Sequence, residues 1–159
     1  MECKKLRHFF APRKVDRLET GGRRMTASHP DIPMWLQGRR MDEAGRDALQ
    51  ARFTPHSQGI GFAVLGGAFG EGIDLPGARL IGAFIATRGL PQVNPVNEQI
   101  RQRMQACHGR GYDYTHLFPG IQKVVQAAGR VIRTPQDTGV VFLMDDRFAR
   151  AEVQNLLPG

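Results

Sequence analysis

Apolar residues gather in short runs along the chain, separated by polar or glycine-rich stretches. Five runs have the length and flanking turn residues of buried β-strands, at positions 6–11, 32–36, 61–65, 80–86 and 139–144. Between these runs, several segments carry apolar residues at helical spacing. Strands that alternate with helices predict an α/β fold with a doubly wound, mainly parallel sheet flanked by helices.

Helix signals differ in strength along the chain. Asp42 is a good N-cap for a helix that runs to about Phe53. One face of that helix is predicted to be buried, with Ala48, Leu49, Arg52 and Phe53 on it. The region after the first strand is predicted to be poorly helical, because Gly21 and Gly22 interrupt it.

A further helix signal lies in the second half of the chain. Asn94 followed by Pro95 combines an N-cap with a first-turn proline and predicts a helix to about Cys107. Ile100 and Met104 share one face of this helix, so we expect both side chains in the core.

Composition limits the number of domains and the compartment. With 159 residues and 41% hydrophobic content, the chain can bury one core. No stretch approaches the roughly 20 apolar residues of a membrane span, and charges fill the N-terminus, so we expect a soluble, cytoplasmic protein. Cys3 and Cys107 have no CxxC spacing and the histidines have no ligand spacing, so the sequence predicts no disulfide, metal site or iron–sulfur cluster.

The net charge of +7 is concentrated in two stretches. Residues 1–24 carry a net charge of +5 and residues 75–134 carry +6, whereas the other two stretches carry −2 each. Lysine and arginine side chains that neutralise phosphates release counterions, so a polyanionic partner is one interpretation. A basic surface that only keeps the protein soluble is the other, and charge alone does not separate them.

The segment PGIQKVVQAAGRVIR at 119–133 predicts a third helix, opened by Pro119. Its apolar side chains should face the sheet: Ile121, Val124, Val125, Ala128 and Ile132. Gln126, Arg130 and Arg133 then share the opposite flank. Two guanidiniums and an amide on one flank can clamp phosphate oxygens, although a solvated basic face with local salt bridges fits the spacing equally well.

The glycine-rich stretch GGAFGEGIDLPG at 66–77 follows a predicted strand directly. Glycines let main-chain N–H groups approach a ligand, and open α/β sheets bind ligands at the carboxyl ends of their strands. Glu71 and Asp74 could accept hydrogen bonds from sugar hydroxyls or fix the loop itself. A tight surface connection with solvated acids is the alternative.

Two apparent nucleotide motifs in the sequence lack the required residues. Gly67 and Gly72 have the glycine spacing of a P-loop, but Ile73 and Asp74 follow where lysine and serine or threonine are needed. The sequence DEA at 42–44 begins like a DEAH box but follows charged residues, so it is better interpreted as a helix N-terminus.

Two segments together resemble motifs V and VI of the XPD/DinG family of superfamily 2 DNA helicases. They are GGAFGEGIDLPG, here called the motif V segment, and PGIQKVVQAAGRVIRTPQDTGVVFLMDDRFA at 119–149, here called the motif VI segment. The intervening IGAFIATRGLPQVNPVNEQ resembles the segment that joins them in the family, except that Arg88 stands where the family is apolar. The resemblance runs over residues 31–157 and implies the second RecA-like motor domain. Residues 1–30 would be a poorly matching strand and irregular segment of the same domain.

The resemblance also implies roles for individual residues. Arg130 and Arg133 would be arginine fingers. Further residues that match ATP-contacting positions are Gln126, Gly129, Glu71 and Asp74. The family's DNA track would include Gly66, Gly67, Phe69 and Gly72.

The partners implied are single-stranded DNA and the first RecA-like motor domain of the same helicase, with no membrane. ATP with Mg²⁺ would be bound mainly by that first domain, since nothing in this sequence resembles Walker A, a true Walker B box or the cysteines of the family's iron–sulfur domain. The chain alone is therefore expected to be inactive as an ATPase. Two alternatives remain: a truncated, non-catalytic remnant that binds nucleic acid, and an unrelated α/β enzyme that uses the glycine loop for a nucleotide.

Overall fold

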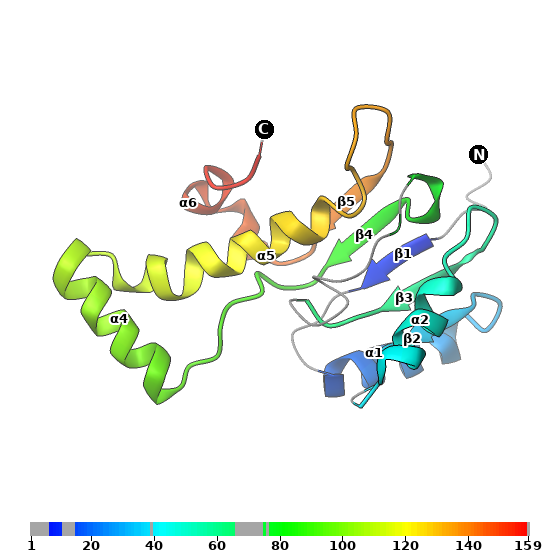
Figure 1. The fold of residues 1–159 in the computed structure, drawn as a ribbon, viewed down its shortest axis with the longest axis horizontal. Helices are drawn as coiled ribbons and strands as arrows, with labels where there is room; N and C mark the ends of the chain where they lie inside the picture. The colour runs from blue at the N-terminus through cyan, green and yellow to red at the C-terminus, as the bar shows by residue number, and fades with distance from the viewer. Residues whose placement is uncertain (1–6, 11–14, 39, 66–74, 76, 159) are drawn as a thin grey trace.

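The computed structural model describes residues 7–10, 15–38, 40–65, 75 and 77–158. Within these ranges, five short strands form one parallel sheet in the order β2-β3-β1-β4-β5 (Figure 1). The strands are β1 Arg7–Phe10, β2 Met34–Leu36, β3 Gly59–Phe62, β4 Gly82–Ile85 and β5 Val140–Leu143. β1 is the central strand, because it pairs with β3 on one side and with β4 on the other. The α/β fold predicted from the alternating pattern is confirmed.

Helices connect the strands, as the pattern predicts. They are α1 Val15–Ser28, α2 Glu43–Ala51, α4 Pro95–His108, α5 Phe118–Ala128 and α6 Ala151–Gln154. Three short helical turns accompany them: η1 Gly77–Arg79, the π-helical η2 Asp113–Leu117 and η3 Asp146–Ala149. Both predicted N-caps are confirmed, since Asp42 Oδ1 accepts from the main-chain N–H of Gly45 and Asn94 Oδ1 accepts from that of Asn97, each at 2.8 Å.

Alternate residues of the strands face opposite layers. In β3, Ile60 and Phe62 pack with Met25 of α1 on one side of the sheet. Gly61 faces the other side, where a Cβ would lie 2.4 Å from Cζ of the fully buried Phe53. The twofold period of a strand therefore divides the core into two layers, one on each face of the sheet.

The larger layer lies beneath α2 and α5. It contains Leu49 of α2 and Ile121 and Val124 of α5, together with Phe148 and Val153 from the C-terminal segment. Because α5 is anchored in this layer through two of its side chains, the orientation of its remaining faces is fixed relative to the sheet.

The region 15–28 differs from the prediction. It forms the continuous helix α1 across Gly21 and Gly22. The reason lies in packing: a Cβ at Gly22 would lie 2.5 Å from Cδ2 of Leu36, so the glycine lets α1 approach β2 closely. Tertiary packing thus outweighs the low helix propensity of the glycine pair.

Two predictions of buried helix faces are wrong in part. In α2, Leu49 is buried as expected but Ala48 is exposed, and after the helix ends Phe53 is buried whereas Arg52 is exposed. Within α4 no side chain is buried, and Ile100 is 42% exposed. Figure 1 shows α4 standing to one side of the sheet, beyond the reach of the core. Its apolar spacing therefore has no core to face in this chain.

The third strand begins two residues earlier than predicted, at Gly59, although Ala63 and Leu65 beyond its end are still buried. The other four strands lie within the predicted ranges. None of the helices in the described ranges combines the length and the apolar character that crossing a bilayer requires.

Candidate functional site

The motif VI segment begins on α5, where Ile121 and Val124 are buried as predicted, whereas Val125 and Ala128 are only half-buried. Ile121 and Val124 are 3% and 1% exposed. Gln126 is exposed and lines an open hollow of about 500 Å³ between α5 and Leu156. The amide of Gln126 is therefore available to a partner on the outer side of α5.

The helix ends earlier than the spacing predicts. Gly129 is the C-cap, and its main-chain N–H donates to the carbonyl oxygen of Val125 at 2.8 Å. Beyond this point the chain turns, so Val131 is buried at 3% exposure while Ile132 is 49% exposed. The prediction that Ile132 faces the sheet is wrong. Gln126, Arg130 and Arg133 therefore do not share one helix flank as predicted, since Arg130 lies in the turn and Arg133 lies beyond it.

A carboxylate holds the main chain at Arg133. Asp137 Oδ2 accepts from the N–H groups of Arg133 at 3.0 Å and Thr134 at 2.9 Å. These hydrogen bonds hold the pKa of Asp137 below its usual value, with the Arg133 N–H as the largest cause. Arg133 is exposed and Arg130 is half-buried, so a fixed turn presents both side chains at the end of α5. The aspartate four residues after Arg133 was the sequence signal for this turn, and it was missed.

The two ends of α5 lie at opposite ends of the sheet. At its start, a Cβ on Gly120 would lie 2.6 Å from the carbonyl oxygen of Arg88, just after β4. After its end, Val131 lies against Gly139, whose Cβ would also approach the carbonyl oxygen of Ile81, just before β4. With 11 residues in α5, the separation is on the order of 16 Å.

The motif V segment lies almost entirely outside the described residues. This applies to all six of its predicted ligand-contacting residues: Gly66, Gly67, Phe69, Glu71, Gly72 and Asp74. The flanking Leu65 and Leu75 are described, and both are buried in the larger core layer at 8% and 1% exposure. Leu65 also touches Gly89, so the chain enters the motif V segment beside the carboxyl end of β4.

Several arginines of the basic stretch 75–134 have partners within the fold. Arg79 Nε donates to the carbonyl oxygen of Phe53 at 2.8 Å. Arg101 pairs with Glu98 at 2.6 Å, and this pair lowers the pKa of Glu98 to about 2. Arg110 pairs with Asp113 at 2.8 Å. These three cations serve structural contacts, so only part of the predicted basic surface is available to a polyanion.

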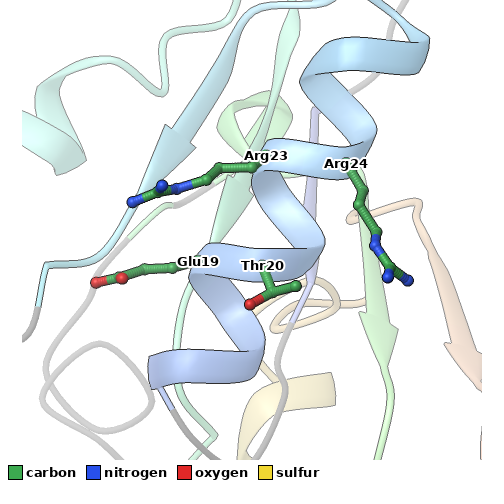
Figure 2. Close-up of a pocket in the computed structure, with 4 residues that line it drawn as sticks. All are labelled: Glu19, Thr20, Arg23 and Arg24. Atoms are coloured by element: carbon green, nitrogen blue, oxygen red, sulfur yellow. The ribbon is translucent and has the colours of Figure 1, made fainter.

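The basic N-terminal stretch ends on α1 at an open hollow of about 480 Å³ (Figure 2). Figure 2 shows Glu19 and Arg23 projecting to one side of α1 and Arg24 projecting to the other. Arg23 and Arg24 are both exposed. Because they point in different directions, the two arginines do not form one basic patch.

Aromatic side chains cluster before α5. Tyr114 meets the Phe118 ring edge-on with centroids 5.2 Å apart, and the guanidinium of Arg110 lies 5.6 Å from the centre of Phe118. Tyr112 lies 5.5 Å from His116. Both tyrosines remain more than 40% exposed, so they pack within the cluster through one side and leave the other side open.

The parallel sheet and its flanking helices define an α/β domain of the RecA-like kind. The sequence model of one family, described as the helicase C-terminal domain, matches residues 10–159. The chain belongs to this helicase C-terminal domain family.

Curated relatives agree with this assignment. A Methanocaldococcus jannaschii protein named probable ATP-dependent helicase is 33% identical over 128 residues, which cover 75% of this chain and 19% of that protein. The ATP-dependent DNA helicase YoaA of Escherichia coli is 30% identical over 119 residues, which cover 73% of this chain and 18% of that protein. The chain thus spans about a fifth of the length of these relatives.

A solved structure shows the same fold. The chain named XPD_APO superposes with a TM-score of 0.73 at 17% identity, covering 96% of this chain and 31% of that one. Together with the family match, this similarity confirms the resemblance to the C-terminal motor domain of XPD/DinG-type helicases.

Proposed function

We propose that this domain is the second motor domain of an ATP-dependent DNA helicase. In this role Arg130 and Arg133 act on ATP held by a first motor domain, and the motif V segment forms part of a track for single-stranded DNA. The family assignment and the DNA helicase relatives support the proposal.

The observation that carries the proposal is that one part of the motif VI segment is buried in the core while another part is accessible from outside it. Ile121 and Val124 on the inner face of α5 are buried in this domain's core, while after the helix Arg130 is half-buried and Arg133 is exposed. A ligand of these arginines must therefore approach from outside the core, as a nucleotide bound to another domain would.

The donor set suits a triphosphate. Each guanidinium carries a permanent charge and can donate two parallel hydrogen bonds to phosphate oxygens. Gln126 and the main chain at Gly129 would add polar contacts, and Glu71 and Asp74 would complete the nucleotide contacts. ATP, with Mg²⁺ bound mainly by the first motor domain, would supply the transferable phosphoryl group, and the arginines would stabilise the charge on its oxygens.

In the proposal, Gly66, Gly67, Phe69 and Gly72 of the motif V segment contribute to the track for single-stranded DNA. The chain enters this segment at Leu65, which touches Gly89 at the carboxyl end of β4.

The test places this domain in a helicase that has its own first motor domain. Residues 10–159 would replace the matching region of Escherichia coli YoaA, and ATP hydrolysis would be measured with and without single-stranded DNA. Arg130→Ala and Arg133→Ala should each lower kcat by about 10³-fold or more, because an arginine finger is worth about 10³ to 10⁵ in rate. The affinity for a labelled oligonucleotide, followed by fluorescence anisotropy, should change little.

A matched control separates charge from geometry. Cations after a helix C-terminus stabilise the helix through its dipole, so Arg130→Lys keeps that contribution but loses the planar fork. Arg130→Lys should therefore retain stability and still lose most of the ATPase rate. An active chimera whose kcat is unchanged by both alanine substitutions would refute the arginine assignment. A folded chimera that binds DNA but hydrolyses no ATP would favour the non-catalytic remnant.

A further inference from the structure

Arg88 is a buried cation just after the carboxyl end of β4. The residue is 4% exposed. Within the described part of the chain, no group accepts a hydrogen bond from its Nε, although that atom is buried. Arginine is almost never fully buried unless it is paired, because removing a charge from water is costly. The buried Nε of Arg88 thus lacks a compensating acceptor among the described contacts.

The backbone that carries Arg88 is closely confined. Gly89 adopts a φ of 63°, and a Cβ there would lie 2.9 Å from Cδ2 of Leu65. On the other side, Gly120 of α5 packs against the carbonyl oxygen of Arg88. Since both neighbours require glycine, Arg88 is fixed between the end of β3 and the start of α5.

Arg88 lies at a position in the fold where ligand binding is common. Open parallel sheets bind ligands beyond the carboxyl ends of their strands, which is where Arg88 lies. Arg130 and Arg133 are at the opposite end of α5, so Arg88 is separate from these two arginines.

We infer that Arg88 forms a phosphate-binding site at the carboxyl end of β4, where its guanidinium donates hydrogen bonds to the oxygens of a phosphate group. The phosphate belongs either to a nucleic-acid backbone or to a nucleotide. Planar guanidinium groups suit phosphate oxygens, and the anion would compensate the buried charge.

Thermal unfolding of the 159-residue chain tests the site directly. Inorganic phosphate at ten times its Kd, with ionic strength held constant by chloride, should raise the Tm by about 3 to 6 °C. Arg88→Met should remove this rise. Without phosphate, the Met variant should unfold at the wild-type temperature or above, because an unpaired buried charge has been replaced by an apolar side chain of similar length.

Arg103→Met is the matched control, because Arg103 is exposed on α4 and should leave the phosphate effect intact. Two results would overturn the inference. One is a phosphate effect that persists in Arg88→Met. The other is a fall in the Tm of Arg88→Met without phosphate, which would identify Arg88 as a structural residue with a protein acceptor.

Anisotropy titrations distinguish the two phosphate sources. If the backbone of DNA supplies the group, Arg88→Met should weaken the binding of a labelled deoxythymidine 12-mer. It should also reduce the slope of log K against log salt by about one. If a nucleotide supplies the phosphate, the variant should instead weaken the binding of a fluorescent ADP analogue. Arg130→Ala should leave the phosphate-induced rise in Tm unchanged. The phosphate site and the proposed motor function can therefore fail independently of each other.

Discussion

Gly120 packs directly against the main-chain carbonyl of Arg88, and a Cβ at position 120 would lie 2.6 Å from that oxygen. Backbone atoms on both sides leave little room for adjustment. Gly120→Ala should therefore lower the free energy of unfolding by about 1 to 3 kcal/mol, as overpacking does elsewhere. Urea denaturation followed by circular dichroism would measure the change.

Gly38 provides the control for this substitution, since a Cβ there would meet nothing within 4 Å. Gly38→Ala should leave the unfolding midpoint close to that of the wild type. Equal midpoints for Gly120→Ala and Gly38→Ala would contradict the close packing of α5 on the segment after β4.

The adjacent glycines of α1 should respond in opposite directions to alanine. Gly21 has open space around its Cβ position, so Gly21→Ala should stabilise the helix by about 0.5 to 1 kcal/mol. At Gly22 the same gain is outweighed by contact with Leu36, where overpacking costs about 1 to 3 kcal/mol. Thermal unfolding of the two single variants would measure the difference, and a stabilised Gly22→Ala would show that α1 lies farther from β2.

Asp145 should make stability depend on acid pH. Its Oδ1 accepts from Arg147 Nε at 2.6 Å and from the Arg147 N–H at 3.0 Å, and these bonds lower the pKa of Asp145 to about 2. Because the folded pKa is depressed, the stabilisation is complete above the unfolded value near 4 and is lost as pH falls from about 4 through about 2. Arg147 is partly exposed, so about 1 kcal/mol is expected.

Asp145→Asn tests this dependence by urea denaturation at several pH values. The variant should be less stable than the wild type at pH 7, and the difference should shrink as the pH falls below 4. A difference that stays constant down to pH 3 and below would mean that the Asp145 carboxylate contributes nothing through its charge.

Asp137 should support the proposed action of Arg133 without touching its ligand. Asp137→Ala removes the acceptor that fixes the Arg133 main chain, so kcat in the YoaA chimera should fall by about 10- to 100-fold. Asp137→Asn keeps an acceptor oxygen and should retain most of the rate. If both variants hydrolysed ATP at the wild-type rate, the turn would have no positioning role.

Much of this fold could be predicted from the sequence because its strands and caps carry local signals. The apolar runs located the five strands of the described residues, and the side chains of Asp42 and Asn94 marked two helix starts. The resemblance of the motif V and VI segments located the family, which the comparisons then confirmed.

The errors arise where tertiary contacts decide the outcome. Helical spacing placed Ile132 on the sheet side, but Gly129 ends α5 and the turn buries Val131 instead. The spacing of Ile100 gave no sign that α4 would stand beyond the core. The burial of Arg88 is not encoded in local periodicity, because it depends on which segments meet in space. The turn held by Asp137 is different, because its hydrogen bonds to Arg133 and Thr134 are local and the aspartate was a readable signal.

The central position of β1 has a consequence for how the chain folds. β1 lies between β3 and β4, which both follow it in the chain, so the sheet cannot be completed in the order of synthesis. Non-local parallel pairing of this kind slows folding. Deleting residues 7–10 would remove the middle of the sheet and leave the pair β2-β3 with no strand to join it to β4-β5.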